Sequence, residues 1–394
     1  MTPYERIDRA IDEASEALRG LSLEIHTHPE LNFEEHHAHQ VLTDFLDSEG
    51  FEVVRGAYTM PTAFKAVAGN GGPTLAVISE YDALPGIGHA CGHNLIAIAG
   101  VGAGVGLRAG LEGVPGTVVI LGSPAEEGGA GKQILIEQGA FNGVDAALMA
   151  HPAPADSATP RVQALQALKV EYFGKNAHAA AMPWNGVNAL DALVAGYNAV
   201  SMLRQQIKPT DRVHGIFTDA GLKPNIIPDY TAGDYYVRSA TMAELSELKA
   251  KVQAALESGG MAAGCRVEVT WVGRAYTDLV SNDPLATRYC AHMEELGLPV
   301  GKIPWFGAST DMGNVSYVVP TIHPMFGIPS DPMNANHTAP FTAAAATEEA
   351  HERTIRVAKA MARAAYDAIT QPELMAQVKR DFVANVPEPG DPLR

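Results

Sequence analysis

The segment Glu80-Tyr-Asp-Ala-Leu-Pro-Gly-Ile-Gly-His-Ala-Cys-Gly-His-Asn94 decides the fold of this chain. A short apolar run, residues 74–78, precedes it and is bounded by glycine and proline, which predicts a buried strand. Residues 95–107 are small or apolar and contain no proline, so they predict a buried helix. Asp82 therefore follows the end of a strand, which is where open α/β sheets bind ligands.

His89, Cys91 and His93 lie between the predicted strand and helix, and glycines separate them. Alternate residues of an extended or tightly turned segment can point to one side, so Cys91 and His93 can bind one metal ion together. Thiolate and imidazole suit zinc and similar divalent metals. On this segment alone, a buried free cysteine beside histidines at a helix start remains the alternative.

The length and charge of the chain limit its possible functions. A chain of 394 residues suggests two domains, or one with an insertion. The formal net charge of −17 argues against nucleic acid and anionic membrane surfaces as partners. Three cysteines are too few for a disulfide framework, and residues 1–9 lack an apolar signal core. No run is long enough to span a membrane, so we expect a cytoplasmic protein.

Two further predicted strands, residues 116–121 and 144–150, also end at polar residues. Because strands alternate with helices here, we expect a mainly parallel sheet whose strand ends share one edge. The side chains delivered to that edge are Asp82, Glu126, Glu127 and His151.

The pattern changes after residue 165. Residues 166–275 are predicted to form strand–helix–strand–strand–helix–strand, the order of a ferredoxin-like split βαβ unit. We therefore expect an α/β protein in which residues 1–165 and 276–394 form a metal-binding catalytic domain and 166–275 an inserted α+β domain. A long alanine-rich helix is predicted over residues 343–369.

Five histidines cluster near the N-terminus, around residues 30–35: His26, His28, His36, His37 and His39. These histidines could form a metal site. Alternatively, they could be solvent-exposed residues at the start of a helix, with no ligand. The sequence favours the second interpretation, because no cysteine or closing ligand accompanies them.

One more metal-ligand candidate, His337, lies in a polar loop just before the long helix. A catalytic metal site needs a few protein ligands and an open position for water, and a two-metal site shares a ligand. The collected candidates meet that need: Cys91, His93, Glu126, Glu127, His151 and His337.

The chain resembles the M20 metallopeptidase and amidohydrolase family, and within it subfamily D. The matching residues are Tyr81-Asp-Ala-Leu-Pro85, Gly88-His-Ala-Cys-Gly-His-Asn-Leu95, Pro124-Ala-Glu-Glu-Gly128, Met149-Ala-His-Pro152, Gly174-Lys-Asn-Ala-His-Ala179 and Asn336-His337. Asn94 and residues 307–316 match one branch of that subfamily. Many aminoacylases of the subfamily have aspartate in place of Asn94, and that departure bears on the substrate rather than on the metal centre.

The resemblance implies two divalent metal ions per chain, either zinc or manganese, with cobalt as a further candidate. The implied ligands are Cys91, His93, Glu127, His151 and His337, with Cys91 as the bridge. Glu126 is the implied general base, and Asp82 orients a ligand histidine. The division of roles between the two glutamates follows from the resemblance and not from their spacing.

The resemblance also gives the inserted domain a role as lid and dimerisation domain. In a homodimer or higher homo-oligomer, His178 of one chain would stabilise the oxyanion in its partner's site. Asn225 and Arg238 would hold the substrate carboxylate, which the planar guanidinium suits. The alternative is that these residues have no catalytic role, and that they are simply a histidine in a loop, an asparagine in a turn and an arginine on the surface.

We therefore expect a hydrolase that cleaves the amide bond of a dipeptide or an N-acyl amino acid, aminobenzoyl and β-alanyl compounds included. Metal-activated water would attack, with Glu126 as general base. Hydrolytic deamination of an unusual aryl or small amide substrate is a second enzymatic hypothesis. A metal-binding scaffold is the non-enzymatic hypothesis, and the intact Glu126–Glu127 pair argues against it.

Overall fold

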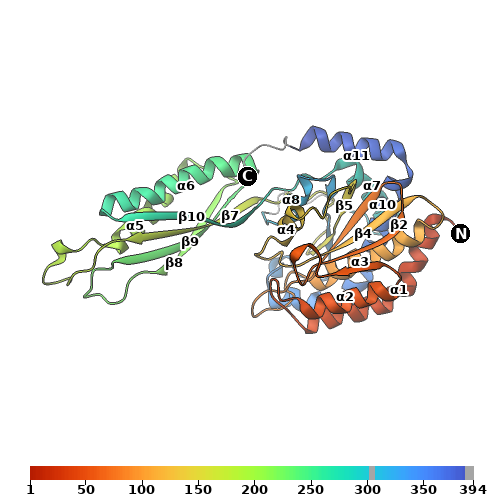
Figure 1. Ribbon diagram of the computed structural model, residues 1–394, viewed down its shortest axis with the longest axis horizontal. Coiled ribbons are helices and arrows are strands. Elements are labelled where there is room, and N and C mark those ends of the chain that lie inside the picture. The colour runs from red at the N-terminus through yellow and green to blue at the C-terminus, as the bar shows by residue number, and fades with distance from the viewer. Residues whose placement is uncertain (301–306, 387–394) are drawn as a thin grey trace. The chain divides into compact units, whose positions relative to one another are not determined.

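The chain forms two compact units in the computed structural model, which describes residues 1–300 and 307–386 (Figure 1). One unit comprises Met1–Arg161 together with the segment that begins at Leu279, and the other comprises Val162–Asp278. The catalytic and lid roles expected for these units stay predictions. Within the described ranges, every helix is too short or too polar to cross a membrane.

The first unit is built on a six-stranded sheet in the order β1-β2-β4-β3-β5-β11. Strands β4, β3, β5 and β11 are parallel, and β1 and β2 add an antiparallel edge. The expectation of a mainly parallel sheet is confirmed. The strands are β1 Glu52–Arg55, β2 Phe64–Asn70, β3 Thr74–Glu80, β4 Gly116–Ser123, β5 Ala146–Leu148 and β11 Thr321–Ile322.

Helices cover both faces of this sheet, because the side chains of each strand alternate between the faces. On β3, Leu75 and Val77 pack into the larger core cluster, and Ala76 and Ile78 pack into the smaller one. The larger cluster includes residues of α1 Pro3–Thr27, α2 His36–Ser48, α3 His93–Gly110, α7 Asp283–Glu295, α10 Glu348–Thr370 and α11 Pro372–Asn385. The smaller includes residues of α4 Gly131–Glu137 and α8 Met312–Ser316.

Helix α3 approaches the sheet closely because glycines line it. A Cβ on Gly100 would lie 2.4 Å from the carbonyl oxygen of Ile78 on β3, and one on Gly106 would lie 2.5 Å from Ile11 on α1. A larger residue at position 100 would push the helix away from the backbone of β3, and one at position 106 would displace the side chain of Ile11. The close packing fixes the first turn of α3 beside the end of β3.

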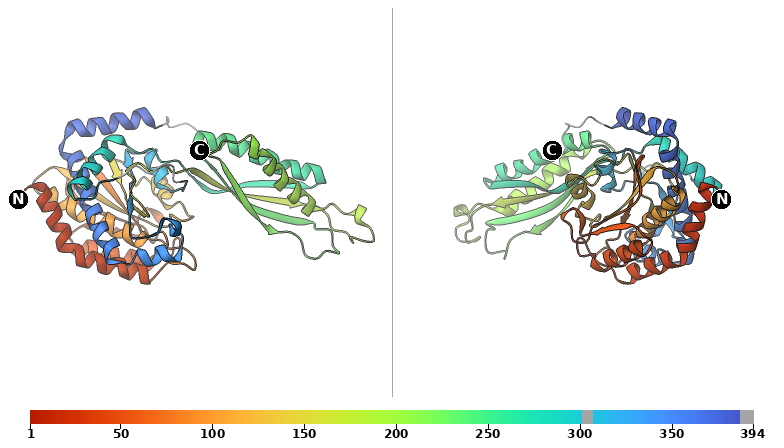
Figure 2. Two further views of the ribbon diagram at one scale, coloured as in Figure 1. Left: turned by 180° about the vertical axis from the view of Figure 1, so that it is seen from behind. Right: turned by 45° about the vertical axis from the view of Figure 1, so that its right-hand side comes forward.

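The second unit is a four-stranded antiparallel sheet, in the order β10-β7-β9-β8, with α5 and α6 on one face (Figure 2). The expected ferredoxin-like arrangement is confirmed. Its elements are β7 Ala164–Phe173, α5 Ala189–Met202, β8 Arg212–Asp219, β9 Tyr230–Ser239, α6 Met242–Ala263 and β10 Arg266–Tyr276.

The predicted helix over residues 343–369 is wrong as a single element. It is split into α9 Ala339–Ala344 and α10, because the Thr347 side chain accepts the N–H of Ala350 and starts a new helix. The strand predicted to Ala150 is also too long. It ends at Leu148, and His151 begins β6 His151–Ala153, which pairs with β12 Met325–Gly327. Short 3₁₀ turns complete the fold at Ala57–Thr59, Pro183–Asn185, Leu203–Gln205 and Pro332–Asn334.

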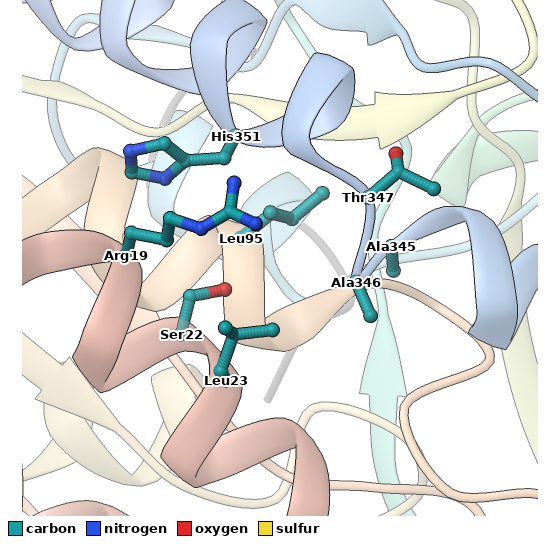
Figure 3. A pocket seen from close by; sticks show the side chains of 8 residues that line it. All are labelled: Arg19, Ser22, Leu23, Leu95, Ala345, Ala346, Thr347 and His351. Atoms are coloured by element: carbon teal, nitrogen blue, oxygen red, sulfur yellow. The ribbon is translucent and has the colours of Figure 1, made fainter. Parts of the chain in front are cut away.

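The break before α10 borders a small pocket where α1, α3 and α10 meet (Figure 3). Its lining residues are Arg19, Ser22, Leu23, Leu95, Ala345, Ala346, Thr347 and His351. The ring of His351 is buried, and its Nε2 lies 3.2 Å from the hydroxyl of Ser15. Burial lowers the pKa of His351, and the nearby Arg19 lowers it further.

We predict that His351 makes the fold sensitive to acid. The lowered pKa means that the unfolded chain takes up the proton first, near its ordinary value of about 6.5. The stabilisation by neutral His351 is therefore present above about pH 6.5 and is lost as the pH falls through the folded-state pKa. Urea unfolding from about pH 7 to about pH 5 should show a smaller loss of unfolding free energy for His351→Gln than for wild type. Equal losses would contradict the prediction.

Candidate metal centre

The candidate site lies at the carboxyl edge of the parallel strands, where β3 and β4 end side by side. Glu80 is the last residue of β3 and pairs with Ser123, the last residue of β4. Asp82 follows the first strand, and Glu126 and Glu127 follow the second. Parallel pairing therefore delivers acidic residues from separate segments to one place.

Cys91 is common to two groups of candidate ligands at this edge. One ligand atom from each of Cys91, His93 and His151 lies within 4.8 Å of the others, and the same holds for Cys91, Glu127 and His337. A third group contains His93, Glu126 and Glu127. The structure thus brings together all six candidates that the sequence collected, from loops and helix ends far apart in the chain.

Hydrogen bonds determine which ring nitrogen of His93 and of His151 faces the candidate metal site. His93 Nδ1 lies 3.1 Å from Asp82 Oδ1, and His151 Nδ1 lies 2.7 Å from the carbonyl oxygen of Pro152. Because these oxygens accept, Nδ1 donates in both rings and Nε2 faces the site. His93 Nε2 lies 3.8 Å from Glu127 Oε1, and His151 Nε2 lies 3.4 Å from Cys91 Sγ.

The electrostatics fit a divalent cation. His93 Nε2 and Glu127 Oε1 are buried and form no hydrogen bond with any residue in the described part of the chain. Burial lowers the pKa of His93, but Glu80 and Asp82 outweigh it and raise that pKa well above its ordinary value. The surroundings of this ring therefore favour positive charge. Thiolate, imidazole and carboxylate in one cluster suit zinc-type metals, although burial raises the pKa of the Cys91 thiol until a metal binds.

The environments of the two adjacent glutamates differ. Burial raises the pKa of Glu126 well above its ordinary value, and the negative charges of Glu80 and Glu127 add to the rise. Burial also acts on Glu127, but His337 and His93 outweigh it and lower the pKa of Glu127. A carboxylate with a raised pKa suits proton transfer, and one that stays ionised suits metal binding.

Two unusual backbone conformations hold these side chains. His337 has a φ of +69° and donates its N–H to the carbonyl oxygen of Ala90 at 2.8 Å. Ala125 has a φ of +58°, and its N–H donates to Glu35 Oε1 at 2.9 Å. Residues other than glycine adopt this region at a cost, which the surrounding contacts must offset. Asn336 adds one such contact, donating to the carbonyl oxygen of Pro152 at 3.1 Å.

A buried charge network that the sequence did not predict lies beside the site. Lys132 Nζ donates to Glu80 Oε2 at 2.5 Å and to Asp311 Oδ1 at 2.7 Å, and all three side chains are fully buried. Glu80 Oε1 in turn lies 3.5 Å from His93 Nε2. The position of Glu80 at the end of a predicted strand, two residues before Asp82, could have indicated Glu80 as a member of this network. Nothing local marked Lys132 as buried.

Asn94, noted for its departure from many aminoacylases, makes structural contacts. Its amide donates to Ser22 Oγ and to the carbonyl oxygen of Ala345, both at 2.9 Å, and so joins α3 to α1 and to the break before α10.

The remaining site candidates belong to the second unit. His178 is exposed, and its Nδ1 accepts the N–H groups of Ala180 and Ala181, which leaves the ring proton on Nε2. The backbone of Asn225 accepts the N–H of Ala179 at 3.1 Å, so these two loops lie together. Arg238 lies next to the C-terminal residue of β9, and its guanidinium is 6.0 Å from the ring centroid of Tyr236. The roles of all three residues stay predictions.

Comparisons with known proteins bear on this arrangement. The model of peptidase family M20/M25/M40 matches residues 76–364. The Xaa-Arg dipeptidase of Homo sapiens is 44% identical over 405 residues, covering 97% of this chain and 92% of that protein. One subunit of the p-aminobenzoyl-glutamate hydrolase of Escherichia coli (strain K12) is 32% identical over 317 residues, covering 75% and 66%. A dinuclear metal-binding M20 peptidase from Bacillus subtilis has the same fold, with a TM-score of 0.73 at 19% identity over 91% of this chain and 99% of that one.

We predict that Lys132 is required for stability. Lys132→Met would leave Glu80 and Asp311 as buried carboxylates without their cation, which typically costs about 3–5 kcal/mol. The triple variant Lys132→Met, Glu80→Gln, Asp311→Asn should recover part of that loss, and Lys251→Met, at an exposed lysine, should be nearly neutral. Chemical denaturation measures all three. A loss below about 1 kcal/mol for Lys132→Met would contradict the prediction.

Proposed function

The chain belongs to peptidase family M20/M25/M40, and on that premise we propose that it is a metal-dependent dipeptidase for dipeptides with a basic C-terminal residue. One observation supports the hydrolase assignment above all others: Cys91 belongs to two groups of candidate metal ligands, and both groups lie beside the Glu126–Glu127 pair. The substrate class rests on the Xaa-Arg dipeptidase that matches nearly the whole chain. The net charge of −17 supports it, since it attracts cationic substrates.

Each residue at the sheet edge has a separate task in this proposal. Cys91, His93, Glu127, His151 and His337 would hold two divalent ions. Such ions would supply Lewis-acid activation of a scissile carbonyl and of a water molecule. Glu126 would accept a proton from the attacking water and return it to the leaving amine. Asp82 keeps the ring of His93 oriented and, through its second oxygen, accepts the N–H of Glu127 at 2.9 Å.

The second unit would complete the site in a homodimer or a larger homo-oligomer. His178 would donate its Nε2 proton to the developing oxyanion, since its Nδ1 is already an acceptor. Asn225 and Arg238 would bind the substrate carboxylate. A cytoplasmic location and zinc or manganese as native metals belong to the same proposal. Fractionation of the source cells and metal analysis of protein purified without added metal test these two points.

A second candidate is hydrolysis of aminobenzoyl-glutamate, because the subunit of the Escherichia coli hydrolase for that compound matches 75% of the chain. A hydrolysis screen separates the two candidates. Its substrates are dipeptides ending in Arg, Lys, Leu or Glu, β-alanyl dipeptides, N-acyl amino acids and aminobenzoyl-glutamate, each with zinc, manganese or cobalt. We expect the highest kcat/KM for Arg and Lys dipeptides and loss of activity on chelation. Preference for aminobenzoyl-glutamate would replace our proposal, and full activity of metal-free protein would refute it.

The glutamate pair offers a matched test of roles. We predict that Glu126→Gln lowers kcat by at least ~10²-fold, the usual scale for loss of a general base, with metal content unchanged. Glu127→Gln should instead lower the metal content. Inductively coupled plasma mass spectrometry and steady-state kinetics measure the two effects. If Glu126→Gln loses metal and Glu127→Gln keeps it, the assigned roles are reversed.

The dimer proposal predicts complementation between inactive chains. His178→Ala should slow turnover at a cost of ~2.7–4 kcal/mol, the scale of one lost oxyanion donor, and keep its metal. Mixing His178→Ala with Glu126→Gln chains should restore part of the activity, because some mixed dimers contain one intact site. No recovery despite demonstrated exchange of chains would show that His178 does not act across an interface.

A further inference from the structure

The corner between α1 and α2 carries a second cluster of possible metal ligands that the proposed mechanism does not use. It consists of Glu24, His28 and His37, each offering one ligand atom within 4.8 Å of the others. Glu24 Oε1 lies 3.0 Å from His37 Nε2 and 3.5 Å from His28 Nδ1. The two imidazole rings lie 4.5 Å apart between centroids.

The local fold explains why these three side chains meet. Glu24 and His28 are four residues apart at the end of α1 and therefore lie on one face. His37 is the second residue of α2. The carboxylate of Glu30 accepts the N–H groups of His37 and Ala38 at 2.9–3.0 Å, which fixes the start of α2 against the end of α1.

Glu24 supplies the closing ligand that the histidine-rich segment lacked in the sequence. His28 Nδ1 lies 2.9 Å from the carbonyl oxygen of Glu24 and 3.5 Å from the Oε1 of the same residue. His37 Nε2 donates its proton to Glu24 Oε1 at 3.0 Å. A metal ion bound between these two atoms would take the place of that proton.

The alternative is a cluster of ion pairs with no ligand. The side chains of Glu24, His28 and His37 are 47%, 54% and 34% exposed, and exposed ion pairs contribute little to stability. Both histidines nevertheless converge on the same carboxylate oxygen. Two imidazoles and one carboxylate suit zinc, copper or nickel and are poor ligands for magnesium, and the exposure leaves room for a solvent ligand.

We propose that Glu24, His28 and His37 form a surface site for one zinc-class divalent ion, distinct from the Cys91 cluster. An ion bound there joins the end of α1 to the start of α2. The same corner contacts the carboxyl edge of the parallel strands, because the carbonyl oxygen of Glu30 accepts the N–H of Ala83, the residue after Asp82, at 2.8 Å. A bound ion would therefore stabilise the segment between α1 and α2, which is hydrogen-bonded to the residue after Asp82.

Equilibrium dialysis of the full chain against zinc tests the proposal, with bound metal counted by mass spectrometry. We expect wild type to hold about one more zinc per chain than His37→Gln or His28→Asn, or to bind that ion at least about tenfold more tightly. The matched control is His36→Gln, which alters an exposed neighbour that pairs with Glu34 instead. It should bind as wild type does. Equal zinc content in all four proteins, or an equal loss in the control, would overturn the proposal.

A spectroscopic readout identifies the ligands without reference to catalysis. Copper(II) added after the catalytic metals are loaded should give an electron paramagnetic resonance signal split by two nitrogens in wild type and by one in His37→Gln. An excess of magnesium should not displace it, and the variants should keep the hydrolytic activity of the loaded enzyme. A copper signal without nitrogen splitting, or one unchanged by the substitution, would refute the site.

Discussion

The structure depends on how buried carboxylates are neutralised at the carboxyl edge of the parallel sheet. Glu80, Asp82 and Glu126 meet there with almost no exposure to water. Burying such charges is costly unless cations accompany them. Lys132 supplies one cation, held by Glu80 and Asp311. Glu80 and Asp82 outweigh the effect of burial and raise the pKa of His93, so positive charge is favoured at that ring. Divalent metals would provide it.

The scaffold makes this edge rigid by different means on each side. Glycines such as Gly100 let α3 pack against β3, so His93 starts its helix next to Asp82. On the far side, His337 is held in a left-handed conformation by a backbone hydrogen bond to Ala90. Buried Glu35 holds the loop before Glu126 by accepting the N–H of Ala125, while burial raises the pKa of Glu35 to about 7. These constraints preorganise the candidate ligands before any metal binds.

The sequence predicted much of this fold because its signals are local. Strand–helix alternation indicated the parallel sheet, and the split βαβ order indicated the second unit. The helix over 343–369 was wrong, because one threonine, Thr347, captures a backbone N–H and outweighs alanine propensity. At the site, residue types near strand ends indicated the candidates. The Lys132 network could not be predicted, since it depends on Asp311, 179 residues away in the chain. The role of Glu24 likewise required the packing of α1 against α2.

Anomalous X-ray diffraction from a crystal loaded with zinc or manganese tests the central claim most directly. The account predicts two peaks about 3.5–4 Å apart, the usual spacing of two-metal sites. Cys91 Sγ should lie between them, with His93 and His151 at one peak and Glu127 and His337 at the other. A single peak, or two peaks that do not share Cys91, would contradict the account.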